Sequence, residues 1–253
     1  MLTSYSMKKA DRNYLKFLEK KNQIINEVKD ILNNLAADLL PKFSIEKYIA
    51  MFTRHNDGDK LEGLRSMSTS PLLNQLCIER SSIPGLVCNH CYSVNYNNLR
   101  RSLREKLERN TAILTSTIID YDLIPTIIDR YFRIESFGDL QNAIQAINYL
   151  NFILKNPNTM FAWWTKNPQY IKQALEQLNI EKPENVQIVF SSPCINNPAD
   201  LDRLKKVFPF IDKTFTVYDK KTTETINCGS LHCINCLNCY KPGGVTEVKE
   251  LLK

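Results

Sequence analysis

Glycine is scarce in this chain: 7 of 253 residues, about 3% where about 7% is usual. No G-x-G-x-x-G and no G-x-x-x-x-G-K-[ST] occurs, so the dinucleotide fingerprint and the phosphate-binding P-loop are both excluded. No run approaches the ~18 apolar residues of a membrane helix. The N-terminus is charged within its first turns and lacks the apolar core of a secretory signal. We therefore expect a cytoplasmic protein with no membrane partner.

Cysteine is also too rare for a disulfide scaffold. The chain has 8 cysteines in 253 residues, about 3%, whereas such proteins have about 8–10%. The chain is long enough, and with 43% hydrophobic residues apolar enough, to build a core without cross-links. Thiols stay reduced in the cytoplasm, where clustered cysteines indicate metal ligands or redox groups. The net charge of +6 permits an anionic or nucleic-acid partner without requiring one.

The first part of the chain has a helical pattern. Apolar residues recur at spacings of three and four between residues 7 and about 40, and Pro41 follows them. We expect residues 1–42 to be an N-terminal helical extension that packs on the main domain.

Residues 43–222 show a different pattern, in which strands alternate with helices. The expected strands cover residues 48–53, 66–70, 131–136, 159–165, 186–191 and 213–218. The expected helices cover residues 97–120, 140–155, 169–178 and 199–208, and residues 77–98 are expected to be a loop. This alternation is typical of α/β proteins with a parallel sheet. Without a glycine fingerprint, a partial or full (β/α) barrel is favoured, with active residues at the C-terminal strand ends.

Four cysteines lie close together in the C-terminal segment, residues 223–253. They are Cys228, Cys233, Cys236 and Cys239, spaced C-x4-C-x2-C-x2-C. Four thiolates can hold a [4Fe-4S] cluster or a structural zinc ion. The short C-x2-C steps are closer to ferredoxin spacing than to a zinc ribbon, which favours the cluster. His232 is a candidate alternate ligand, although a neighbour in the loop is the simpler interpretation.

A second group lies in the expected loop at 77–91. Its members are Cys77, Cys88 and Cys91, and Tyr92 follows them. Three cysteines can hold three irons of a cubane and leave the fourth open to a substrate or cofactor. The alternatives are a zinc loop completed by His90 or a remote residue, and a single centre shared with the C-terminal group. Cys194 stands apart, and a half-buried free thiol is the simplest interpretation of it.

The expected strand ends carry a third set of candidates. With a period of two, Arg133 and Glu135 share one strand face while Phe132 and Ile134 take the other. In a barrel the charged face points inward, where charges are costly unless paired or bound to a ligand. Arg133 and Glu135 therefore predict an internal ion pair or a site. Further candidates at this edge are Asp139, Thr165, Lys166, Asn167, Ser191 and Ser192. Helix capping is the alternative for Asp139, and local capping for Ser192.

These features in this order resemble the radical S-adenosylmethionine superfamily. A cysteine loop ending Cys88-Asn89-His90-Cys91 follows the first strand, Gly138-Asp139 follows the second, and a cysteine run closes the chain. The superfamily loop reads C-x3-C-x2-C, whereas ten residues separate Cys77 from Cys88 here. The chain also resembles a phage-encoded family called gene product 88, through Cys88–Tyr92, Phe132–Asp139, Thr165–Lys166 and Cys228–Cys239.

The resemblance implies a [4Fe-4S] protein that cleaves S-adenosylmethionine to a 5′-deoxyadenosyl radical. It implies a cluster on Cys77, Cys88 and Cys91, and an auxiliary cluster on the C-terminal cysteines. The expected cofactor-binding residues are Gly138, Asp139, Ser191 and Ser192. The expected catalytic residues are Arg133, Glu135 and Lys166, of which Arg133 or Lys166 would meet a carboxylate. The phage resemblance and the basic stretch 100–109 suggest a nucleotide or nucleic-acid substrate. A non-catalytic, metal-stabilised protein that binds host protein or nucleic acid, or senses redox state, is the alternative.

Overall fold

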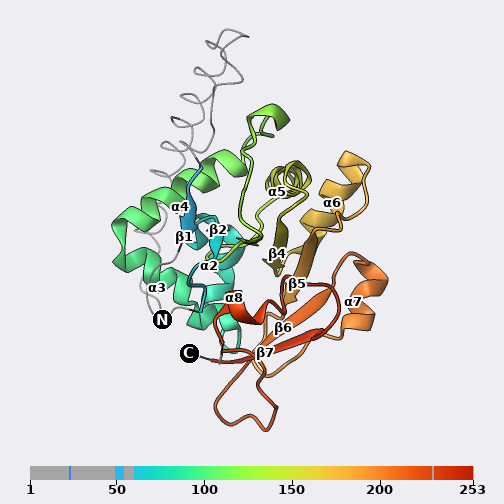
Figure 1. The fold of residues 1–253 in the computed structure, drawn as a ribbon. Helices are drawn as coiled ribbons and strands as arrows, with labels where there is room; N and C mark the ends of the chain where they lie inside the picture. Colours follow the sequence, from blue (N-terminus) through green and yellow to red (C-terminus); the bar gives the residue numbers. More distant parts are fainter. Residues whose placement is uncertain (1–22, 24–48, 54–59, 230, 253) are drawn as a thin grey trace.

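A single seven-stranded sheet organises the computed structural model, which describes residues 23, 49–53, 60–229 and 231–252 (Figure 1). Its strands are β1 (Met51–Thr53), β2 (Arg65–Met67), β3 (Tyr131–Ile134), β4 (Met160–Thr165), β5 (Val186–Ser191), β6 (Lys213–Tyr218) and β7 (Glu247–Leu251). They pair in sequence order. β1 is antiparallel to β2, and all pairs from β2 to β7 are parallel. The mixed α/β prediction is confirmed.

Helices follow one another around the outside of the strands (Figure 1). The α-helices are α2 (Gln75–Ser81), α3 (Tyr92–Leu99), α4 (Arg101–Leu114), α5 (Ala143–Lys155), α6 (Pro168–Leu178), α7 (Leu201–Val207) and α8 (Cys233–Cys236). Short 3₁₀ turns are η3 (Pro71–Leu73), η4 (Val87–His90) and η5 (Tyr121–Leu123). α4, α5 and α6 pack on the sheet and bury the main apolar core.

Alternation along the strands divides the sheet into an outer and an inner face. Phe132 and Ile134 of β3 belong to the core shared with the helices. Arg133 on β3 and Trp164 on β4 instead line a cavity on the inner face. Successive strand residues point to opposite faces, so the helices cover one face and leave the other for a site.

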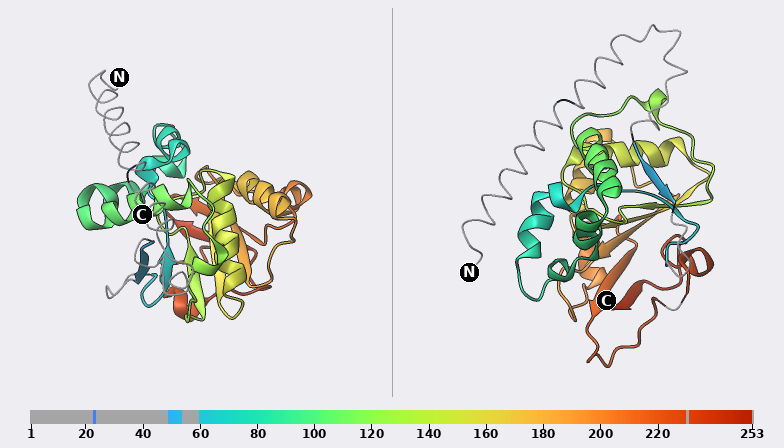
Figure 2. Two further views of the ribbon diagram at one scale, coloured as in Figure 1. Left: turned by 90° about the horizontal axis from the view of Figure 1, so that it is seen from above. Right: turned by 90° about the vertical axis from the view of Figure 1, so that its left-hand side faces the viewer.

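The two ends of the parallel sheet are linked by contacts across the C-terminal segment. Lys60, just before β2, forms a 3.0 Å ion pair with Glu250 of β7. The Cys233 amide donates to the Lys60 carbonyl at 2.8 Å, and α8 lies beside the segment leading into β2 (Figure 2). Within the described ranges no ladder pairs β7 with β1 or β2. A closed barrel is therefore not observed.

The predicted N-terminal helix lies outside the described residues. Elsewhere the observed elements differ from the sequence predictions. The stretch 77–98, predicted to be a loop, is largely helical, because Asn74 caps α2 by accepting from the Leu76 and Cys77 amides. β7 was not predicted, and it pairs with β6 as the last strand of the sheet.

Candidate functional site

A cavity of about 690 Å³ opens on the inner face of the sheet. Its walls come from the C-terminal ends of the strands, from the segment η4 to α3, and from the C-terminal segment. Seven of the eight cysteines line it. They are Cys77, Cys88, Cys91, Cys228, Cys233, Cys236 and Cys239. The fold thus brings together two groups that lie more than a hundred residues apart in the sequence.

The first group sits on short helical elements beyond β2. Cys77 is in α2, Cys88 in η4, and Cys91 at the end of η4. An antiparallel bridge between Leu86 and Cys194 fixes this segment to the loop that follows β5. All three thiols are half-buried.

Charged groups surround these three thiols. Burial, and then the charge of Asp139, raise the pKa of the Cys77 thiol. Burial also raises the pKa of Cys88, while Lys166 opposes the increase. For Lys166 itself burial would lower the pKa, but Asp139 and the neighbouring thiols raise it overall. Lys166 therefore remains a cation beside this group.

Asp139 connects the ends of two strands. Its Oδ1 accepts from the Thr165 hydroxyl at 2.6 Å and its Oδ2 from the Lys166 amide at 3.0 Å. It does not cap α5, which Asn142 caps instead. The carboxylate thus holds the end of β4, and with it Lys166, against the turn after β3.

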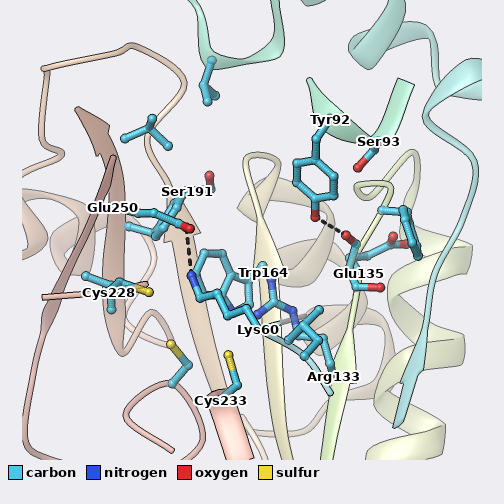
Figure 3. Close-up of a pocket in the computed structure, with 18 of the residues that line it drawn as sticks. Lys60, Tyr92, Ser93, Arg133, Glu135, Trp164, Ser191, Cys228, Cys233 and Glu250 are labelled. Atoms are coloured by element: carbon cyan, nitrogen blue, oxygen red, sulfur yellow. Dashed lines mark hydrogen bonds and ion pairs between the residues drawn. The ribbon is translucent and has the colours of Figure 1, made fainter. Parts of the chain in front are cut away.

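The second group packs more tightly. Cys228 and Cys239 contact the apolar cluster of Val189, Phe215, Val217 and Val248. Cys233 and Cys239 contact a second cluster that includes Tyr240. Burial raises the pKa of Cys239 to about 12, against the lowering effect of Arg133. Figure 3 shows Cys228 and Cys233 on one side of the cavity, near Lys60 and Arg133.

Glu135 does not join Arg133 on the inner face. It follows β3 with a left-handed φ of 58°, and its carboxylate is buried in a network of five donors. The Thr69 hydroxyl and amide, the Gly138 amide, the Gln145 amide group and the Tyr149 hydroxyl all donate to it. Burial raises the pKa of Glu135 to about 7, and the bonds from Tyr149 and Thr69 offset part of that effect. The structure thus places Arg133 and Glu135 in separate surroundings.

Close packing explains why residue 138 is glycine. A Cβ at this position would lie 2.6 Å from the Thr69 carbonyl oxygen and 2.9 Å from the Glu135 Oε2. These distances are shorter than real Cβ contacts, so a larger residue would force the backbone apart.

The remaining candidates have simpler surroundings. Ser191 is buried and lines the cavity. The Ser192 hydroxyl accepts from the Ala199 amide at 3.0 Å, whereas Asp200 caps α7. His232 lies 3.5 Å from Glu62. Cys194 is outside the cavity lining.

The cysteine thiols are suitable metal ligands by their chemistry, but their positions among the described residues do not form a metal site. In the described part of the chain, no three His, Cys, Asp or Glu side chains are close enough to hold one metal ion as they stand. Thiolates are nevertheless the ligands of iron–sulfur clusters and of structural zinc. Each group influences its own members electrostatically and has a cation beside it. Metal binding would require the cysteine segments to draw closer together.

Among the residues of the cavity wall that sequence reasoning missed are Lys60, Trp164 and Tyr240. Lys60 precedes the first parallel strand, and Tyr240 directly follows the last cysteine. For Trp164 a signal was present, because period two along β4 places it on the same face as Ala162, opposite Trp163.

The fold and the cavity define the class: an α/β protein with a six-stranded parallel sheet whose inner face carries two groups of cysteines. A family model described as gene product 88 matches residues 64–247. The chain belongs to this family, as its sequence motifs suggested. No curated protein matches the chain, and no solved structure matches it. Among the helices that the structure describes, none has the length and apolar character needed to cross a membrane.

Proposed function

We propose that this protein is an iron–sulfur protein of radical S-adenosylmethionine type with two separate [4Fe-4S] centres. The observation that carries the proposal is that a group of three cysteines and a group of four cysteines, far apart in the sequence, line the same cavity. Ligands and catalytic residues of parallel α/β sheets commonly lie at the C-terminal strand ends, as here. The sequential strand order and the joined sheet ends support a partial (β/α) barrel.

In this proposal the first group is the catalytic centre. Cys77, Cys88 and Cys91 would hold a cluster with one iron open to S-adenosylmethionine, and a reduced cluster supplies the electron for its cleavage. Lys166 would offset the negative charge of the thiolates, and Asp139 holds Lys166 in place. Gly138 keeps the turn after β3 close to Thr69. Ser191 would contribute a hydroxyl to the cofactor.

The second group would hold an auxiliary centre. Cys228, Cys233, Cys236 and Cys239 provide all four ligands and need no exogenous one. A nucleotide or nucleic-acid substrate stays a prediction. In the basic stretch that suggested it, Arg101 lies 2.9 Å from Glu105 and Arg104 lies 3.9 Å from Glu108, as on a solvated helix.

The test is metal and sulfide analysis of the full chain purified without oxygen. We expect a brown protein with about eight iron and eight sulfide per chain, which binds S-adenosylmethionine and releases 5′-deoxyadenosine once reduced. A colourless protein with stoichiometric zinc would refute the proposal.

A second candidate, a non-catalytic metal-stabilised binding or redox-sensing protein, is favoured by the packing of the C-terminal group. Cys228 and Cys239 contact apolar core residues, as ligands of a structural site commonly do. Iron or zinc without binding of S-adenosylmethionine would select this candidate.

A further inference from the structure

Arg133 differs from Lys60 and Lys166, two lysines that line the cavity. Lys60 pairs with Glu250 at 3.0 Å. Lys166 interacts electrostatically with the carboxylate of Asp139. In the described residues Arg133 has no acidic partner within ion-pair distance, and its Nε is buried without a hydrogen-bond partner. Arg133 is half-buried, and its polar neighbours are Tyr240 and the thiols of Cys233 and Cys239. A partly desolvated cation without a carboxylate beside it is costly, so this position is arranged for an anion that is not part of the described chain.

Aromatic side chains hold the Arg133 guanidinium in place. Its Cζ lies 4.0 Å from the centroid of the Trp164 ring, and Figure 3 shows the two side chains together in the cavity. Trp164 in turn packs against Phe215 at 4.5 Å between centroids. The Trp164 Nε1 is likewise buried without a described partner. Stacking fixes the plane of a guanidinium, which then presents its N–H groups to a carboxylate or phosphate in one orientation.

The walls beside Arg133 indicate the rest of the ligand. Trp164, Phe215, Val217 and Val248 all line the cavity, and its volume of about 690 Å³ is within the range for a small organic molecule. Flat and branched apolar surface next to a fixed guanidinium suits a planar apolar body that carries one anionic group. Arg133 lies toward the C-terminal cysteines, since it acts on Cys233 and Cys239, whereas Lys166 acts on the first group.

From this arrangement we infer that the cavity binds a planar organic anion, a carboxylate or a phosphate, whose charged group pairs with Arg133 and whose body lies along Trp164. The inference deepens the proposed function, because it gives the class of substrate for that same cavity. Arg133, rather than Lys166, receives the anion.

The experiment uses the full chain, purified without oxygen, with its metal content measured. Benzoate and phenyl phosphate are the anionic probes, and benzamide is the neutral isostere of benzoate. Binding is followed by tryptophan fluorescence and by calorimetry. We expect at least one anion to bind at least about tenfold more tightly than benzamide, since a charge-assisted pair is lost in the neutral probe.

Two variants locate the site. Arg133→Met should remove that preference. Arg130 is an exposed arginine directly before β3, and Arg130→Met should keep the preference. Equal binding of benzoate and benzamide, or equal effects of the two variants, would overturn the inference. So would an Arg133→Met protein that binds anions normally but loses C-terminal metal, since Arg133 would then serve only as a counterion for the thiolates.

The outcome is separable from that of the proposed function. Binding of anions that depends on Arg133 in a protein without iron and sulfide would sustain this inference and refute the cluster. Iron, sulfide and cleavage of S-adenosylmethionine without any preference for the anions would sustain the proposed function and refute this inference. Melting temperatures of both variants, matched to the parent protein, exclude misfolding as the cause.

Discussion

The two cysteine groups face the same cavity but have different supports. The first lies on short helical elements in which no residue is buried, and it is fixed by the Leu86–Cys194 bridge and by charges. The second packs against two apolar clusters and lies between the last two strands. The first also has three cysteines and the second four. The difference suggests that the first group is arranged to bind an exogenous ligand, and the second to close a centre by itself.

The largest effect is expected for Cys88→Ser. It removes one of the three proposed ligands of the first group, so cleavage of S-adenosylmethionine should fall to background and the iron content by about half. Iron analysis and release of 5′-deoxyadenosine measure both effects. Loss of all iron from this single variant would show that the groups share one centre, and the comparison would then fail.

The matched change in the second group is Cys236→Ser. A closed metal site contributes free energy of folding, so this variant should lose the other half of the iron and several kcal/mol of stability. Binding of S-adenosylmethionine should survive. Chemical denaturation with parallel metal analysis tests this prediction. Unchanged stability together with lost binding of S-adenosylmethionine would reverse the roles of the two groups.

The wall beside the first group contains a buried acid, and its titration should be visible in stability. The pKa of Glu135 is raised to about 7 in the folded chain, whereas about 4.3 is expected in the unfolded chain. The native state therefore keeps a proton that the unfolded state loses. This contribution is complete below about pH 4 and is lost as the pH rises to about 7, by about 4 kcal/mol in total.

Glu135→Gln removes that titration. The difference in unfolding free energy between parent and variant should change across pH 4–7, even though the amide also weakens the network and lowers stability at every pH. Denaturant titrations at several pH values measure it. A constant difference across this window would contradict the expectation.

The packing of the same wall can be tested at Gly138. Gly138→Ala places a Cβ against the Thr69 carbonyl, and overpacking of this kind costs about 1–3 kcal/mol. Gly229→Ala, beside Cys228, meets nothing within 4 Å. With φ at 116° it should add only backbone strain, about 1 kcal/mol. A larger loss of stability at Gly229 than at Gly138 would contradict the packing argument.

The smallest effect is expected for Cys194→Ala. This cysteine is outside the cavity lining, and its bridge to Leu86 is made by the backbone, which alanine preserves. Metal content and cleavage should be unchanged, and stability should change by less than about 1 kcal/mol. Loss of iron here would make Cys194 an eighth ligand and extend the first group.

The strands with apolar runs were predictable from the sequence. β5 and β6 begin and end at the residues expected, because Val186–Ser191 and Lys213–Tyr218 are buried stretches rich in β-branched and aromatic residues. β7 was not predicted because three of the five residues in Glu247–Leu251 are charged, so the segment resembles an exposed one. α2 was missed for a related reason: it buries no residue, so no apolar periodicity marks it.

The site was predictable in its cysteines and less so in their neighbours. Spacing alone separated the two groups. The left-handed backbone at Glu135 carries no sequence signal, because glutamate rarely adopts it. Alternation therefore placed Glu135 beside Arg133, whereas the chain turns it toward Tyr149. The pairing of Lys60 with Glu250 depends on the sheet ends approaching each other, which local patterns do not encode.

The sequential strand order also determines the order in which the sheet can form during translation. Each parallel strand pairs with the one made just before it, so the sheet can grow as the chain leaves the ribosome. The segment that carries Cys77, Cys88 and Cys91 emerges with the first strands. The C-terminal cysteines follow on the order of ten seconds later at ~5–20 residues per second. During that interval the cavity wall is incomplete, so under the proposed function the first group would be available for metal insertion before the second.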